Sequence, residues 1–103
     1  MIDLRHDHLA IVKSILKQYL PDYTVWAFGS RVTGTAKKYS DLDLTVISDT
    51  PLDFGLLGTV RDAFSESDLP FKVDVVDWAV ASREFREIIK RNHVVLQEKK
   101  RND

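Results

Sequence analysis

The sequence predicts an α/β or α+β fold in which helices pack around a small β-sheet. Segments with helical apolar spacing alternate along the chain with short segments rich in β-branched and aromatic residues. The chain has 103 residues, which is enough for one hydrophobic core and too little for a separate substrate domain. We therefore expect a single domain over residues 1–103 whose substrates bind from outside.

The first half of the chain contains two predicted helical segments and two predicted strands. Apolar residues recur at helical spacing over residues 4–20, which predicts the first helix. Residues 23–28 are aromatic and β-branched and are stopped by Gly29, as is typical of a strand. Ser30 can cap a short helical turn, and residues 41–47 form the second predicted strand.

The second half repeats this alternation. Residues 51–64 place apolar side chains on one helical stripe, although two glycines weaken that helix. A valine-rich strand is predicted over residues 71–78. Ser82 can cap a last helix that ends near residue 91, and residues 93–97 can form a short final strand. The last helix is expected to turn three apolar residues inward: Phe85, Ile88 and Ile89.

The composition excludes several classes of protein. A net charge of -1 argues against broad electrostatic binding to nucleic acid, so we expect no direct nucleic-acid partner. The absence of cysteine excludes disulfides and thiolate metal sites. The N-terminus lacks the apolar core of a signal peptide, and no apolar run approaches the length of a membrane span. We therefore expect a cytoplasmic protein without a membrane partner.

Two aspartates interrupt the second predicted strand. Asp41 and Asp43 are one residue apart, so a strand holds both carboxylates on one face while the intervening apolar residues face the other. Such a pair would repel if bare, and a divalent cation removes the repulsion. Oxygen-only ligands of this kind are suited to Mg²⁺, which commonly shares its shell with substrate phosphates.

Asp74 supplies a third carboxylate from the next predicted strand. If the two strands are neighbours, Asp74 can approach the pair, complete a site for two metal ions and lie near an incoming hydroxyl. The alternative is an exposed acid on an edge strand beside Lys72. Asp77 is a competing third acid, but strand alternation turns it away from Asp74.

The segment before the aspartates can bind phosphate. Gly29 and Ser30 end a strand and open a helical turn, where free backbone N–H groups favour an anion. Gly29 allows close approach to the backbone, Ser30 can donate its hydroxyl, and Arg31 can reach a phosphate or an acidic neighbour. The alternative is an ordinary strand-to-helix turn with a serine cap.

The tryptophans and histidines carry weaker signals. Trp26 and Trp78 are expected in the core or at the sheet edge, with base stacking as the less favoured alternative. The histidines show no zinc-like grouping beyond His6 and His8.

Together these residues resemble a known family. The run GSRVTGTAKKYSDLDL, with KVDVV around Asp74, resembles the signature of the minimal nucleotidyltransferase (MNT) family of the DNA polymerase β superfamily. The resemblance implies a palm-like fold with a mixed sheet packed by helices, and transfer of a nucleoside monophosphate from Mg²⁺-bound ATP to a hydroxyl. It assigns the triphosphate to Gly29 and Ser30, the metals to Asp41 and Asp43, and both the metal and the nucleophile to Asp74.

The resemblance also implies a partner. Stand-alone MNT proteins of this size resemble the antitoxins of HEPN/MNT toxin–antitoxin pairs, in which the antitoxin adenylylates a tyrosine of its HEPN toxin, a ribonuclease. A hetero-oligomer with such a toxin is therefore expected, and the missing substrate domain agrees with a protein substrate. Two alternatives stay open: an antitoxin that neutralises its partner by binding alone, and a small-molecule nucleotidyltransferase completed by a helical partner subunit.

Overall fold

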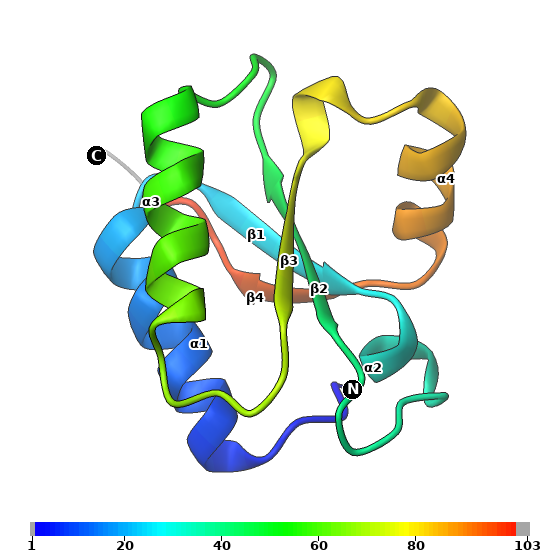
Figure 1. Ribbon diagram of the computed structural model, residues 1–103. Helices are drawn as coiled ribbons and strands as arrows, with labels where there is room; N and C mark the ends of the chain where they lie inside the picture. The colour runs from blue at the N-terminus through cyan, green and yellow to red at the C-terminus, as the bar shows by residue number, and fades with distance from the viewer. Residues whose placement is uncertain (1, 101–103) are drawn as a thin grey trace.

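The computed structural model describes residues 2–100 and contains one four-stranded mixed sheet (Figure 1). The strand order across the sheet is β3-β2-β1-β4. The strands are β1 (Thr24–Phe28), β2 (Leu42–Ile47), β3 (Val73–Asp77) and β4 (Val94–Gln97). The predicted mixed sheet packed by helices is confirmed.

The helices lie on both sides of this sheet (Figure 1). They are α1 (His6–Tyr19), α2 (Ser30–Thr33), α3 (Phe54–Ser65), the 3-10 helix η1 (Trp78–Val80) and α4 (Arg83–Arg91). None of the helices within residues 2–100 combines the length and the apolar character that crossing a membrane requires.

The topology brings the second and third strands together. β1 pairs antiparallel with β2 and with β4, whereas β2 pairs parallel with β3. A parallel pair needs a crossover connection, and α3 supplies it. The pairing places Asp43 directly opposite Asp74.

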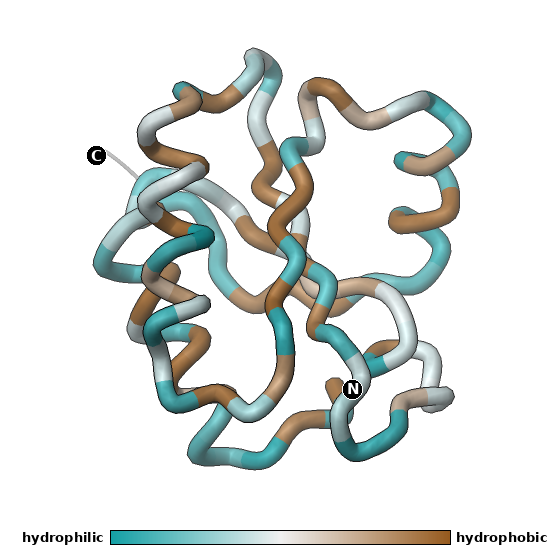
Figure 2. The backbone as a smooth tube through the Cα atoms, in the orientation of Figure 1, coloured by the Kyte–Doolittle hydropathy of each residue, from teal (hydrophilic) through white to brown (hydrophobic). Residues whose placement is uncertain are grey.

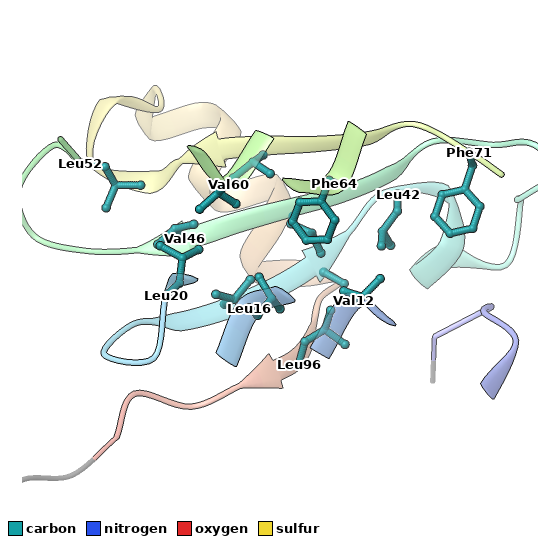
Figure 3. Close-up of a cluster of buried hydrophobic side chains, with 14 residues drawn as sticks. Val12, Leu16, Leu20, Leu42, Val46, Leu52, Val60, Phe64, Phe71 and Leu96 are labelled. Atoms are coloured by element: carbon teal, nitrogen blue, oxygen red, sulfur yellow. The ribbon is translucent and has the colours of Figure 1, made fainter. Parts of the chain in front are cut away.

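One face of the sheet closes the main hydrophobic core. α1 and α3 pack side by side on this face, and their buried side chains meet the strands (Figure 3). Figure 2 shows hydrophobic segments in the central strands and, alternating with hydrophilic ones, along the helices. Most of the core residues come from these helices and from all four strands: Val12, Leu16, Val25, Ala27, Leu42, Leu44, Val46, Val60, Phe64, Val75 and Leu96.

The other face carries a smaller aromatic cluster under α4. Ile89 of α4 is fully buried. The ring of Trp26 stacks on His93 with centroids 4.0 Å apart and meets Trp78 edge to face at 5.4 Å. These contacts confirm the expectation that both tryptophans pack within the fold.

Several details of the predicted elements were wrong. The strand predicted over residues 71–78 spans only Val73–Asp77, and Trp78 begins η1. The helix predicted over residues 51–64 begins at Phe54, because the Asp53 side chain accepts a hydrogen bond from the Leu56 N–H and caps it there. β2 begins at Leu42, so Asp41 lies just before the strand. Ile88 is 58% exposed, because α4 packs only its other apolar side chains against the sheet.

Candidate active site

Asp43 and Asp74 form the centre of the site. They occupy paired positions on neighbouring parallel strands, so their side chains share one face of the sheet. The opposite face at this point is filled by Leu42 and Leu44, which are fully buried. The alternation of β2 therefore holds its carboxylate on the face away from the main core.

The electrostatics show that the three acids interact. The pKa of Asp43 is raised above its ordinary value, first by burial and then by the negative charges of Asp74 and Asp41. Binding a proton or a cation would stabilise the Asp43 carboxylate, because either one neutralises its charge. The arrangement is therefore suited to binding positive charge.

Asp41 is held differently from the other two. It lies outside the strand pairing and its side chain is exposed. The Leu42 N–H donates to the Lys72 carbonyl at 2.9 Å, which fixes the chain immediately after Asp41. The chain before Asp41 is a loop. It is held by backbone hydrogen bonds, such as that from the Ser40 N–H to the Lys37 carbonyl at 3.1 Å, and by side chains.

The acids fit a hard divalent cation by their chemistry, although they do not yet converge. Within residues 2–100 no three acidic or histidine side chains lie close enough to enclose a metal ion as they stand. Asp74 is instead paired with the Lys72 ammonium at 3.4 Å. The pKa of Asp43 is raised by burial and by the other two carboxylates, and the three acids together still form the all-oxygen donor set that Mg²⁺ prefers.

Gly29 lies directly against this cluster. Its φ of 81° is in the left-handed region, and a Cβ at this position would overlap the Oδ2 of Asp43. Only glycine therefore allows the backbone to pass so close to the carboxylate. The predicted serine cap was wrong: Gly29 is the N-cap of α2, and the Ser30 side chain, in the first helical position, forms no hydrogen bond within the described part of the chain. The predicted juxtaposition of the glycine-serine turn and the acids is thus present.

Arg31 differs from the prediction. Its side chain is 6% exposed, and it donates hydrogen bonds to the carbonyls of Ser40, Asp3 and Lys38 at 3.0, 3.0 and 3.2 Å. No carboxylate within residues 2–100 forms an ion pair with it, so the expected acidic neighbour was wrong. The phosphate contact stays a prediction, and the guanidinium could make it only by leaving these carbonyls.

Asp77 has a structural role. Its carboxylate is buried and accepts hydrogen bonds from the Leu52 N–H at 2.9 Å and the Ala79 N–H at 3.2 Å. It therefore caps η1 and ties the loop before α3 to the end of β3, in agreement with its lower rank as a third acid.

The alternative considered for Asp74, an exposed acid on an edge strand beside Lys72, describes its present state: β3 is an edge strand, the Lys72 and Asp74 side chains are 72% and 45% exposed, and they are paired at 3.4 Å. One feature of the site was missed from the sequence. The contact between Asp3 and Arg31 joins residues 28 positions apart, and no local pattern indicates it.

Comparison with known proteins agrees with this geometry. Residues 11–102 match the family model described as "Polymerase beta, Nucleotidyltransferase". The chain belongs to this nucleotidyltransferase family. The resemblance seen in the sequence is therefore confirmed, and the paired acids lie inside the matched region.

Individual relatives narrow the comparison. The chain is 61% identical over 100 residues to a probable protein adenylyltransferase MntA of Haemophilus influenzae, covering 97% of this chain and 88% of that protein. A toxin–antitoxin crystal structure with AMP-PNP is similar with a TM-score of 0.74 and 24% identity, covering 88% of this chain and 73% of that one. A complex of a tri-AMPylated Shewanella oneidensis HEPN toxin with an MNT antitoxin is similar with a TM-score of 0.62 and 21% identity, covering 88% of this chain and 73% of that one. At these identities the two solved structures support the fold.

Proposed function

We propose that this chain is a protein adenylyltransferase that transfers AMP from ATP to a tyrosine hydroxyl of a HEPN-type toxin and so acts as the antitoxin of the pair. The observation that carries the proposal is the pairing of Asp43 with Asp74 beside Gly29, in a chain 61% identical to a probable protein adenylyltransferase. The reaction is adenylyl transfer, as expected for a nucleotidyltransferase family member.

The residues divide the work of binding. The triphosphate of ATP lies along the glycine-serine turn, where Gly29 leaves room for it and the Ser30 hydroxyl donates to a phosphate oxygen. Asp41, Asp43 and Asp74 would hold two Mg²⁺ ions, which would supply positive charge to the phosphoryl oxygens. The raised pKa of Asp43 favours this proposal, because neutralisation by a cation removes the repulsion among the acids.

The chemical step is an in-line displacement. The tyrosine oxygen forms a bond to the α-phosphorus of ATP, the bond between the α-phosphorus and the bridging oxygen breaks, and pyrophosphate leaves. Asp74 accepts the tyrosine proton, so it must separate from Lys72 before the acceptor binds. Alignment of the hydroxyl with the α-phosphorus is the main contribution of the bound partner.

The setting of the reaction follows from its substrates. We place it in the cytoplasm, where ATP and a ribonuclease toxin are present together. The net charge of -1 agrees with a protein partner and with no direct contact to nucleic acid.

Intact-mass measurement of the partner tests the proposal. The chain is expressed in its native host and purified with whatever HEPN-type protein accompanies it, and the complex is incubated with Mg²⁺ and ATP. The partner should gain the mass of one or more AMP groups. An ATP analogue with a methylene group between the α and β phosphates should give no gain, because that bond cannot break. No gain with ATP itself would contradict the proposal.

One observation favours a binding-only antitoxin as the second candidate. Asp74 is paired with Lys72, and the three acids do not converge in the present arrangement. A protein that neutralised its toxin by binding alone would rescue growth when Asp41 and Asp43 are replaced by asparagine. The catalytic proposal predicts that this variant fails to rescue.

A further inference from the structure

The three acids of the site differ in what holds their backbone. Asp43 and Asp74 lie within paired strands, and the sheet fixes both residues. Asp41 precedes β2 and follows the loop of residues 34–40. Its alignment with the other acids therefore depends on the interactions that fix this loop.

Arg31 makes two of these interactions, beside backbone hydrogen bonds from the Thr35 N–H to the Ser30 carbonyl and from the Ser40 N–H to the Lys37 carbonyl. Its Nε donates to the carbonyl of Ser40, the residue before Asp41, and its Nη2 donates to the carbonyl of Lys38. Both bonds are partly buried, and the guanidinium lies over the Phe71 ring at 4.2 Å from its centroid. The buried guanidinium of Arg31 thus holds the loop through two of its carbonyls.

The N-terminal segment completes the arrangement. The Nη1 of Arg31 donates to the Asp3 carbonyl at 3.0 Å, and the Asp3 N–H donates to the Arg31 carbonyl at 2.6 Å. Within the loop, the Ser40 Oγ accepts from the Lys37 N–H at 2.8 Å. One guanidinium therefore joins the N-terminal segment to the loop of residues 34–40 through three carbonyls.

We propose that Arg31 is a positioning residue for Asp41, and that it acts through the loop carbonyls rather than by touching the nucleotide. This inference rests on the proposed function, because it assigns Asp41 to the metal. Lysine cannot replace arginine here, since one ammonium cannot donate in the three fixed directions of the guanidinium fork. Loss of any of these bonds leaves a carbonyl oxygen without its partner and frees the loop.

Metal affinity and loop exchange test the proposal on the purified chain. Mn²⁺ binding is measured by electron paramagnetic resonance for the wild type, Arg31→Lys and Arg31→Met. Amide hydrogen exchange of residues 35–41 is measured at a temperature well below each unfolding midpoint. Both variants should bind Mn²⁺ more weakly, by roughly 10- to 100-fold, as when a residue that orients a ligand is removed. Their loop amides should exchange faster than those of the wild type.

Arg86→Lys provides the matched control. Arg86 also donates to two carbonyls, those of Trp78 and Ala79, and lies over the Trp78 ring at 5.4 Å, but it does not contact the loop. It should lower the unfolding temperature without changing Mn²⁺ affinity. Equal Mn²⁺ affinities for Arg31→Met and the wild type, with only a lower unfolding temperature, would reduce Arg31 to a structural role and overturn the proposal.

A double-mutant cycle isolates the route through Asp41. If Arg31 acts by placing that carboxylate, Arg31→Lys should weaken Mn²⁺ binding in the wild type and have little further effect on Asp41→Asn. Additive losses would overturn the inference.

The two proposals fail separately. Weaker Mn²⁺ binding by Arg31→Lys, together with a partner that gains no AMP, supports the positioning role and rejects the adenylyltransferase. AMP transfer by the wild type, together with an unchanged Mn²⁺ affinity in Arg31→Lys, supports the adenylyltransferase and rejects the positioning role.

Discussion

On the face packed by α1 and α3, β2 presents only buried leucine and valine, whereas on the opposite face it presents Asp43 and Thr45. The first face is closed by helices along its length, and the second is covered by α4 and an aromatic cluster beside the carboxylates. The alternation of one strand therefore separates stability from chemistry. Mutation of a residue on the first face should lower stability, whereas mutation of its neighbour on the second face should lower activity.

The largest expected effect is the loss of AMP transfer in Asp43→Asn. This change removes the charge of a carboxylate that we propose as a metal ligand, and it leaves the apolar face of β2 intact. Transfer to the partner should fall by about 100-fold or more. The measurement is the initial rate of AMP incorporation with saturating ATP. Asp62→Asn, an exposed acid on α3, is the matched control and should retain the wild-type rate.

The adjacent residue should show the opposite behaviour. Leu44 is fully buried in the main core, so Leu44→Ala should lower the free energy of unfolding by about 2–5 kcal/mol. Urea unfolding at pH 7 measures this loss. The fraction that stays folded should still bind Mn²⁺ with nearly wild-type affinity. A loss of metal affinity as large as that of Asp43→Asn would show that the two faces are not independent.

Gly29→Ala should affect both properties by a smaller amount. The left-handed φ of 81° costs an alanine about 1–2 kcal/mol, and its Cβ also displaces the Asp43 carboxylate. Gly34→Ala is the matched control, because Gly34 has a φ of 85° and nothing within 4 Å of an added Cβ. Both variants should lose stability in thermal melts, and only Gly29→Ala should also lose metal affinity. Equal metal affinities in the two variants would show that the contact between Gly29 and Asp43 does not affect metal binding.

The smallest expected effect is a pH-dependent stability difference without divalent ions. The folded-state pKa of Asp43 is raised above its ordinary value of 3.8, so its contribution to stability is fully present below that value and is lost as the pH rises through the folded pKa. Asp43→Asn removes this penalty. Unfolding temperatures of the variant and the wild type should agree at low pH, and the variant should be the more stable at pH 7. A more stable wild type at pH 7 would contradict the raised pKa.

The sequence predicted the parts of the site that local patterns control. The valines around Asp74 indicated its strand, and Gly29 marked the turn. The common face predicted for Asp41 and Asp43 stays a prediction, because the strand begins only at Leu42. Each of these inferences uses the two-residue period of a strand or the freedom of a glycine. The same logic placed Asp77 on the opposite face from Asp74.

The parts that were missed depend on tertiary contacts. For Arg31 the sequence suggested a phosphate or an acidic neighbour, and it gave no sign of the Asp3 and Lys38 carbonyls that the folded chain brings to the guanidinium. The phosphate contact stays a prediction. Ile88 satisfied the helical period and yet is exposed, because α4 covers only part of one face. Burial of a charge among carbonyls and the width of a helix contact have no signature in the local sequence.

The most direct test of the central claim is a crystal structure of the chain with Mn²⁺ and a non-hydrolysable ATP analogue. Anomalous scattering should locate metal ions coordinated by Asp41, Asp43 and Asp74, with oxygen distances of about 2.1 Å, and the triphosphate should lie against Gly29 and Ser30. Lys72 should then have left Asp74. Mn²⁺ bound elsewhere, with Asp74 still paired to Lys72 and the nucleotide away from the glycine-serine turn, would contradict the account.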